Sequence, residues 1–489
     1  MWDVLVAFVT VCVGIYLWAT WNYNYWKTCD VPFIKPLPYF GNIKDLFFMK
    51  KNSGQVYTEL YWKYPEEPAV GIYYMRSPQL LLRDIDLIKT ALIKEFTSFH
   101  DNAFLTGLEN DLFLPLNPSM AKGERWKTLR SLLAKALTTS KMKGMYPLMV
   151  DVCHEMKEHV KHNLGIPIEA KHFSDQYSAD SVASCVFSLK TNSFNDPEAE
   201  FIKMSKQVFK QDFLSSLTMM IVSIMPCLSS VLRVRFISKD VTNFFIKIVK
   251  DLYESRKQNN ITRNDFLQTF LDDYKTSETG IYSLEAITAI TMTFFIDGYE
   301  TSSTLMAFTL FMLGLYPNVQ EKVREEVEAL SHINYETVHD LKYLDAVINE
   351  TLRLYPPWLL LTKQCTQDTV LKSGDRTYPL TKGMSVAVPV YSISRDPQYF
   401  REPTEFDPSR FYETPLPPSF FPFGIGPRAC LGSNFALTQI KLALVYLIEN
   451  FKILPRDEGA TMPELNPRNV IGIVPPNGLW IKFENIKSE

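Results

Sequence analysis

The sequence predicts a mainly helical fold with small β-sheets, built as one large domain behind an N-terminal apolar segment. Long segments repeat apolar residues at helical spacing, and the longest covers residues 284–315. Two short runs, residues 69–75 and 79–83, alternate in the manner of strands. The 489 residues could hold three average domains, but 46% of them are apolar and no low-complexity linker divides them, which favours one continuous core.

Charge and cysteine content narrow the class of protein. Lys and Arg together number 51 and Asp and Glu 54, so nothing indicates a nucleic-acid partner. The seven cysteines are odd in number and lack paired spacing, which is typical of a reducing compartment rather than of a disulfide framework. They stand at positions 12, 29, 153, 185, 227, 365 and 430.

The N-terminus is predicted to be a membrane anchor. Residues 4–21 are all apolar, aromatic or small, which is about the length that crosses a bilayer. Aromatic residues and then lysines follow, which places the rest of the chain on the cytosolic side. A cleaved secretory signal is the alternative, but no small-residue cleavage site is visible. We divide the chain into an anchor (1–26), a proline-rich elbow (27–45) and one domain (46–489).

The helix that begins near residue 123 places Trp126 and Arg130 four residues apart on one face, where together they could hold a carboxylate. Such a pair is more commonly a packing face with a solvated tip. Residues 147–275 are predicted to be mostly helical. Within them the apolar stretch 213–225 is either core or a segment that touches a membrane or closes over a pocket. A local basic surface surrounds the helix start and comprises Lys122, Arg125, Lys127, Lys135, Lys141 and Lys143.

The predicted helix 284–315 is capped by Ser283 and stopped by Pro317, and it would be about 48 Å long. A polar cluster at residues 297–301 interrupts its apolar face, which argues against a transmembrane helix. Gly298 weakens the helix, so that Glu300 and Thr301 could hold a water and pass protons. The structural alternative is a kink in which the Thr301 hydroxyl bonds to the preceding turn.

A further amphipathic helix is predicted over residues 340–355. Glu350 and Arg353 stand three apart on one of its faces. On a protein surface such a pair would contribute only a few tenths of a kcal/mol.

The segment 423–432 reads Phe-Gly-Ile-Gly-Pro-Arg-Ala-Cys-Leu-Gly and precedes a predicted buried helix over residues 435–451. Free N–H groups and the helix dipole would favour a thiolate at Cys430, the form that binds a metal. Gly426 and Gly432 permit a turn and a close approach to something flat, Phe423 can cover one side, and Arg428 offers a fork for a carboxylate. A buried free cysteine beside a helix cap is the alternative.

This segment, as Phe-x-x-Gly-x-Arg-x-Cys-x-Gly, resembles the haem-thiolate loop of the cytochrome P-450 monooxygenases, and most closely of animal microsomal, insect-like members. The resemblance covers nearly the whole chain in family order. It implies the cytochrome P-450 fold, with haem b between the 284–315 helix and the cysteine loop. It also implies an apolar substrate such as a xenobiotic, fatty acid or steroid, dioxygen, and electrons from NADPH through a flavoprotein reductase. A b-type cytochrome would be a second donor, and the location would be the endoplasmic reticulum membrane.

The resemblance assigns roles to residues of this chain. Cys430 is the axial iron ligand, and Trp126 and Arg130 grip a haem propionate. Lys363 stands where relatives often carry arginine to a propionate, and Glu300 with Thr301 supplies protons. Glu350, Arg353 and Arg410 form a buried structural triad. The implied substrate-pocket residues, which include the tip of a predicted hairpin within 469–482, are Phe99, Phe104, Leu105, Phe294, Phe295, Leu359, Leu360, Ile471 and Ile473.

Asp297 departs from the common pattern, which has alanine or glycine at its place. The fatty-acid ω-hydroxylases of the family carry a glutamate there that can become ester-linked to a haem methyl. Three interpretations are open for Asp297: an ester link to haem, a charge in the pocket that alters substrate choice, and a hydrogen-bonded structural carboxylate.

Three other functions are compatible with parts of the sequence. A haem-thiolate isomerase or dehydratase would need no reductase, but it usually lacks the acid and threonine pair that this chain carries. A non-catalytic haem or lipid carrier would share the pocket, and a structural membrane protein would bind no chromophore. The identity of the substrate does not follow from the sequence, because pocket shape depends on loop conformation.

Overall fold

The computed structural model describes residues 2–103, 111–208, 235, 237–276, 283–467, 473 and 475–486. The predictions for Phe104, Leu105, Ile471 and the stretch 213–225 lie outside the described residues. The predicted class is confirmed, because helices make up most of the structure and the strands form three small sheets.

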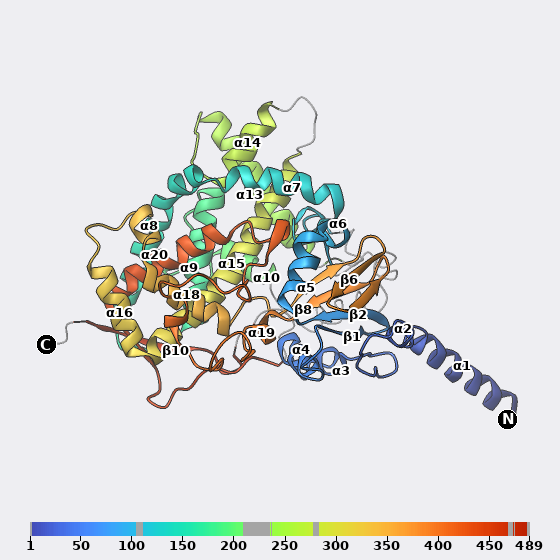
Figure 1. Ribbon diagram of the computed structural model, residues 1–489. Helices are drawn as coiled ribbons and strands as arrows, with labels where there is room; N and C mark the ends of the chain where they lie inside the picture. The colour runs from blue at the N-terminus through green and yellow to red at the C-terminus, as the bar shows by residue number, and fades with distance from the viewer. Residues whose placement is uncertain are drawn as a thin grey trace.

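The helical part is organised around α15 (Leu284–Leu315), which runs through the middle of the molecule (Figure 1). It packs against helices that lie far apart in the sequence, above all α9 (Ala170–Phe187), α13 (Lys239–Gln258), α18 (Lys342–Leu354) and α20 (Ser433–Ile448). The other helices of this part are α7 (Gly123–Ala136), α8 (Thr139–His162), α10 (Glu200–Val208), α14 (Phe266–Thr276), α16 (Pro317–Glu328) and α17 (Tyr335–His339). Their apolar faces share one core, and 22 residues of α15 itself are buried.

Helix α15 begins where the sequence predicts. The Ser283 hydroxyl accepts the N–H of Ala286 at 3.2 Å, and α16 starts at Pro317. The helix is continuous through Gly298, the residue that was expected to weaken it. Buried packing along most of its length stabilises the helix despite the weak helix propensity of glycine.

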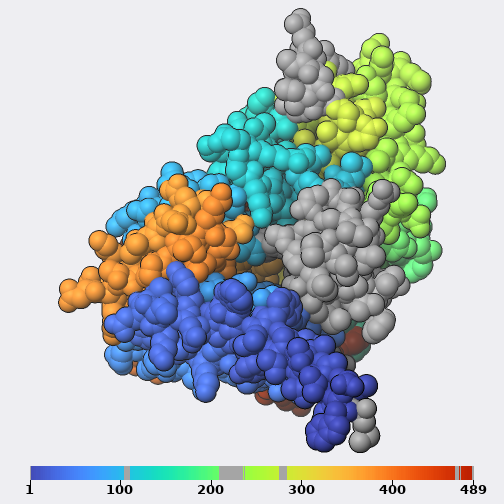
Figure 2. All heavy atoms as spheres, turned by 90° about the vertical axis from the view of Figure 1, so that its right-hand side faces the viewer, coloured from blue at the N-terminus to red at the C-terminus, as the bar shows by residue number. Residues whose placement is uncertain are grey.

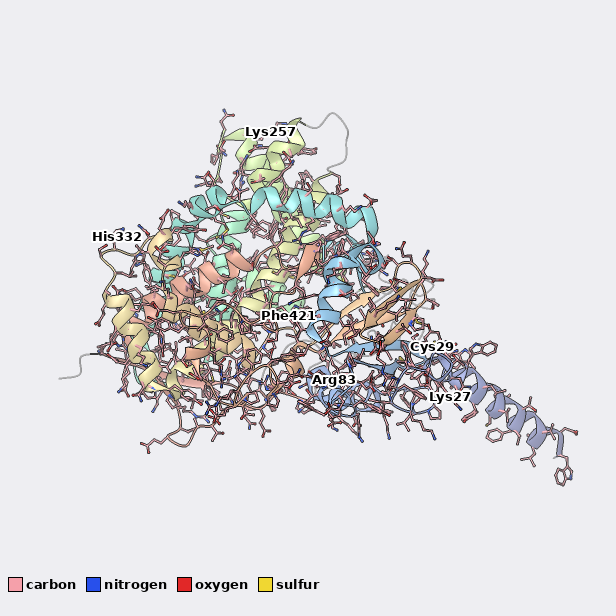
Figure 3. All side chains as sticks on the ribbon, viewed as in Figure 1. Lys27, Cys29, Arg83, Lys257, His332 and Phe421 are labelled. Carbon is pink, nitrogen blue, oxygen red and sulfur yellow. The ribbon has the colours of Figure 1, made fainter. Side chains whose placement is uncertain are left out.

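The sheet part has its own core, in which Phe421 is buried near the centre of the molecule (Figure 3). Its five-stranded sheet has the order β1-β2-β8-β5-β3, with β1 (Ala69–Tyr74) antiparallel to β2 (Ser77–Leu82). The remaining strands are β8 (Ser385–Val388), β5 (Leu361–Gln364) and β3 (Asp101–Asn102). Strands β6 (Thr369–Ser373) and β7 (Arg376–Leu380) form a hairpin on the same side of the molecule as the N-terminal residues (Figure 2).

The third sheet lies at the C-terminal end of the chain and has the order β4-β10-β9. Strand β10 (Trp480–Asn485) pairs with β9 (Phe451–Pro455) and β4 (Ile168–Glu169). The hairpin predicted over 469–482 lies partly outside the described residues, because residues 469–472 and 474 are not among them. The shorter elements are α3 (Lys44–Phe47), α4 (Ser53–Tyr61), α5 (Ile85–Lys89), the π-helix η1 (Thr90–Lys94), α6 (Phe96–Phe99), η2 (Leu114–Leu116), α19 (Val390–Ile393), η3 (Pro408–Arg410) and η4 (Gly426–Arg428).

Helix α1 (Trp2–Thr20) projects away from the rest of the protein (Figure 1) and is long and apolar enough to cross a membrane. The following α2 (Tyr25–Thr28), which contains Lys27 and ends at Cys29 (Figure 3), joins α1 to the first sheet. Trp26 is fully buried there and donates its indole N–H to the Ile72 carbonyl at 2.9 Å. A Cβ on Gly71 would lie 2.4 Å from the Trp26 ring, so β1 accepts this indole only because it carries glycine.

Candidate active site

The loop that carries Cys430 is fixed by its backbone. The Cys430 N–H donates to the Phe423 carbonyl at 2.8 Å, which closes the loop just before α20. Gly426 has a φ of +74°, and a Cβ there would lie 2.5 Å from the Leu92 carbonyl oxygen of η1. The close approach that requires this glycine is thus to η1, whereas we predicted an approach to a flat group.

Gly432 has the open surroundings that were expected at both glycines. It is the N-cap residue of α20, and no atom lies within 4 Å of the position that a Cβ would take. The side chain of Cys430 is likewise accessible, although protein atoms surround it closely enough to raise its pKa by desolvation. The thiol therefore faces an internal space rather than the outer surface.

The protonation of Cys430 corrects the sequence prediction. The backbone N–H groups of Gly432 and Ser433 do lower the pKa of the thiol, as expected at a helix start. Burial raises the pKa by more, so the protein alone holds Cys430 as a thiol. A metal cation at the sulfur would supply the positive charge that a stable thiolate requires.

One face of α15 is open opposite this loop. Phe294, Asp297, Gly298 and Thr301 follow the spacing of a single helix face, and all four are at least partly accessible in a helix that is otherwise largely buried. Negative charge on Asp297 raises the pKa of Cys430, so the two side chains are close enough to interact electrostatically. We infer that the thiol and the middle of α15 border one internal space, called the cavity below, because Cys430 and Asp297 are both accessible although protein atoms surround them closely.

The Asp297 carboxylate is held by an amide from another element. Asn117, which follows η2, donates its side-chain N–H to Asp297 at 3.1 Å. The amide oxygen of Asn117 accepts the Ser119 N–H at 2.7 Å, which fixes the direction of the amide group. Desolvation raises the pKa of Asp297 to about 6, and the hydrogen bond from Asn117 lowers it by less.

The acid and threonine pair on α15 is arranged differently from our prediction. The Thr301 hydroxyl donates to the Asp297 backbone carbonyl at 2.7 Å, which is the arrangement of the structural alternative. Glu300 pairs with Lys171 of α9, with 3.1 Å between the ammonium nitrogen and the carboxylate oxygen, and Lys171 also lies 2.6 Å from Asp175. Burial raises the pKa of Glu300, while the charge of Lys171 lowers it.

Three cations gather at the end of the cavity formed by α7, β5 and the cysteine loop. Arg130 donates to the Ala429 carbonyl at 2.9 Å, and Lys363 donates to the Asn102 side chain at 2.5 Å. The positive charges of Arg428 and Arg130, together with burial, lower the pKa of Lys363 to about 7. Asp101 is the one carboxylate whose charge offsets this repulsion among the described residues.

Arg428 has a structural role in addition to its charge. Its guanidinium donates to the carbonyls of His100, Pro118 and Ala121 at 2.6–2.9 Å and lies 3.3 Å from the Asp101 carboxylate. It also stacks over the Trp126 ring at 4.1 Å. The guanidinium that was predicted to bind a ligand carboxylate is thus occupied by protein groups, because the residue before β3 and the segment between η2 and α7 bring their carbonyls to Arg428.

These donors suit haem b. Among the described residues the cluster sets Arg130, Arg428 and Lys363 against the single carboxylate of Asp101, and this excess of positive charge suits the propionates of a haem. The accessible thiol of Cys430 and the open space at Gly432 lie where a flat, iron-bearing ring would bind. Arg130, Lys363 and Trp126 are the side chains best placed to hold the propionates, because the hydrogen bonds of Arg428 are already used.

The structure brings the predicted triad together. Glu350 and Arg353 are both fully buried and form two hydrogen bonds of 2.7 and 2.8 Å. Arg410 of η3 reaches the same carboxylate at 3.3 Å. Arg353 also donates to the carbonyls of Ser394, Pro403 and Glu405, so the triad ties α18 to the loop before the cysteine segment.

The predicted pocket residues divide into two groups. Phe99, Phe295, Leu359 and Ile473 are buried core residues, so their assignment to the pocket is corrected. Phe99 and Leu359 pack at the sheet and at α4, and Phe295 stacks on Tyr299 at 5.5 Å between ring centroids. Phe294, which stacks on Phe266 of α14, and Leu360 remain partly accessible.

Sequence reasoning missed several residues of the site. Asn117 is 180 positions away from Asp297, and nothing local marks an asparagine in a loop as its partner. Asp101 and Asn102 belong to a two-residue strand that the alternation of residue types could not reveal. Lys171 and Asp175 stand four apart on α9 and could have been recognised as an ion pair, though their link to Glu300 could not.

Comparison with known proteins gives one consistent family. Residues 31–482 match the family model described as cytochrome P-450. Among curated proteins, the chain is 32% identical to a probable cytochrome P-450 9f2 of Drosophila melanogaster, over 99% of both chains. It is also 32% identical to cytochrome P-450 6j1 of Blattella germanica over 93% of this chain and 92% of that one. The probable cytochrome P-450 6a13 of Drosophila melanogaster matches at 32% over the full length of both chains.

Proposed function

Because the chain belongs to the cytochrome P-450 family, whose members use haem b and electrons from a redox partner, we propose that it inserts one atom of dioxygen into an apolar small molecule. The observation that carries this proposal is the placement of Cys430 opposite the Asp297 and Thr301 face of α15, beside a cluster with an excess of positive charge. The substrate is a xenobiotic, fatty acid, steroid or similar lipid.

The residues of the site have different roles in this proposal. Cys430 ligates the iron, and Arg130, Lys363 and Trp126 hold the propionates. When bound, haem b supplies the reductive activation of dioxygen. The fully buried Glu350 and Arg353, together with the partly buried Arg410, keep α18 and the segment before the cysteine loop in register, and Gly426 keeps that loop against η1.

Protons reach the cavity through Glu300 in this proposal. Lys171 is nearly buried between Asp175 and Glu300, and these two carboxylates are more accessible than Lys171. Lys171 therefore acts as a positioning residue that holds the Glu300 carboxylate on the α9 side. Release of Glu300 from Lys171 would let it rotate toward the Thr301 hydroxyl and deliver a proton there.

Electrons are proposed to come from NADPH through a flavoprotein reductase at the membrane of the endoplasmic reticulum, where α1 anchors the chain. The basic surface around α7 is the candidate docking site, although Lys127 and Lys135 already pair with Glu124 and Asp273. Reversing the charge of both lysines should weaken reductase-supported turnover and flatten its dependence on salt concentration. An unchanged salt dependence would remove this surface from the proposal.

The experiment for the whole proposal reconstitutes the full chain with haem, reductase and NADPH, and screens apolar compounds by the displacement of iron-bound water in absorbance spectra. Compounds that bind should then be oxidised in an NADPH-dependent reaction that consumes dioxygen. Turnover of hydroperoxides without NADPH would instead favour an isomerase or dehydratase. Tight binding without any NADPH consumption would favour a carrier.

A further inference from the structure

The carboxylate of Asp297 is the only ionisable group on the cavity face of α15, a helix that the structure describes in full. The other two acidic residues of this helix, Glu285 and Glu300, project from other faces, and Glu300 is paired with Lys171. A negative charge that faces an internal space otherwise bordered by groups such as Phe294 is costly unless something opposes it. A group that offsets the charge of Asp297 is therefore expected nearby.

No cation of the described residues pairs with Asp297. Its hydrogen-bond partner is the neutral amide of Asn117, and the causes of its raised pKa include no positively charged side chain. The cations nearest to the cavity have other partners, since Arg428 pairs with Asp101 and Arg130 donates to the Ala429 carbonyl. The cluster that suits the propionates therefore does not neutralise Asp297.

The carboxylate is also held in a fixed direction. Asn117 is itself buried, and the Ser119 N–H holds its amide so that its N–H group faces Asp297. One carboxylate oxygen accepts this hydrogen bond, and the accessible remainder of the side chain faces the cavity. An oriented carboxylate with a neutral donor on one side and space on the other is a binding site for a ligand cation.

We propose that Asp297, oriented by Asn117, selects substrates that carry a cationic nitrogen on an apolar body, such as a protonated amine or a quaternary ammonium. This inference rests on the proposed function, because it names the class of substrate for the same cavity. The cation contacts the carboxylate, and the apolar body occupies the rest of the space.

The test compares two probes of the same shape in the holoenzyme. Benzyltrimethylammonium and neopentylbenzene differ only in a cationic nitrogen in place of a carbon, and the quaternary nitrogen can neither coordinate iron nor change its protonation. Equilibrium dialysis gives Kd for each probe. Asp297→Asn should lower the preference for the cation over its neutral isostere by about tenfold, which corresponds to about 1.4 kcal/mol. Asp297→Glu should keep the preference, and Glu285→Gln, which removes a carboxylate at the exposed start of α15, should leave it unchanged.

The outcomes separate this inference from the proposed function. If haem binds with its normal thiolate spectrum but Asp297→Asn leaves the ratio of the two Kd values unchanged, the cation site is overturned while the monooxygenase proposal stands. Haem that resists extraction into acidified organic solvent would also overturn it, because an ester would remove the charge of Asp297. Failure of the protein to form the thiolate spectrum would overturn the proposed function and the inference with it.

Discussion

Replacing Gly426 by alanine should detach the cysteine loop from η1. The residue has a φ of +74°, and its new Cβ would lie 2.5 Å from the Leu92 carbonyl oxygen and 3.2 Å from the Ile93 side chain. A left-handed backbone costs a residue with a Cβ about 1–2 kcal/mol. The clash is with a backbone atom, so the two segments must move apart, at a further cost of about 1–3 kcal/mol. The expected loss of stability is therefore about 2–5 kcal/mol, a large part of what holds most domains folded.

Gly374→Ala is the matched control for this prediction. Gly374 also has a positive φ, +55°, but no atom lies within 4 Å of the position of its Cβ. The Gly374→Ala variant should therefore lose only about 1–2 kcal/mol of stability, which is the cost of the left-handed backbone. Thermal unfolding of the two holoenzyme variants, followed by circular dichroism, measures the difference. Haem content per chain should fall in Gly426→Ala and not in Gly374→Ala. Equal losses of stability with equal haem content would refute the reasoning that this contact positions the loop.

Two further predictions follow from the ion pairs. Glu350→Gln leaves the fully buried Arg353 without its charged partner and should lower the free energy of unfolding by about 3–5 kcal/mol. Glu59→Gln, which breaks an exposed pair with Lys51, should lower it by less than about 1 kcal/mol. Similar losses in the two variants would show that the buried pair is not what ties α18 to the loop. Lys171→Met removes the positive charge that lowers the pKa of Glu300, so this carboxyl should stay protonated to a higher pH. The pH profile of product formed per NADPH consumed should therefore move upward in that variant, and an unmoved profile would separate Lys171 from proton delivery.

The sequence predicted those elements whose signals are local. The cap at Ser283, the stop before Pro317 and the alternation over β1 lie within a few residues of the elements that they define, and α15 and β1 begin where expected. The triad of Glu350, Arg353 and Arg410 was available only through the family motif, because the third member comes from a distant loop.

The sequence predictions that the structure corrects concern features that depend on tertiary contacts. Gly426 carries the positive φ expected of its motif, but only the packing of η1 shows what the glycine approaches. Phe99 and Phe295 were expected in the pocket because they are aromatic and near the motifs, but the neighbouring strands and helices bury them. The predicted direction of the Cys430 pKa shift was also wrong. Burial raises this pKa by more than the N–H groups at the helix start lower it, and the depth of burial cannot be read from local sequence.

The absorbance of the reduced protein under carbon monoxide tests the central claim most directly. With a thiolate from Cys430 on the iron of haem b, the wild-type protein should show the strongly red-shifted band that this ligand produces. Cys430→Ala should lose that band even where haem remains bound. A wild-type protein without the band, or a Cys430→Ala variant that keeps it, would contradict the account.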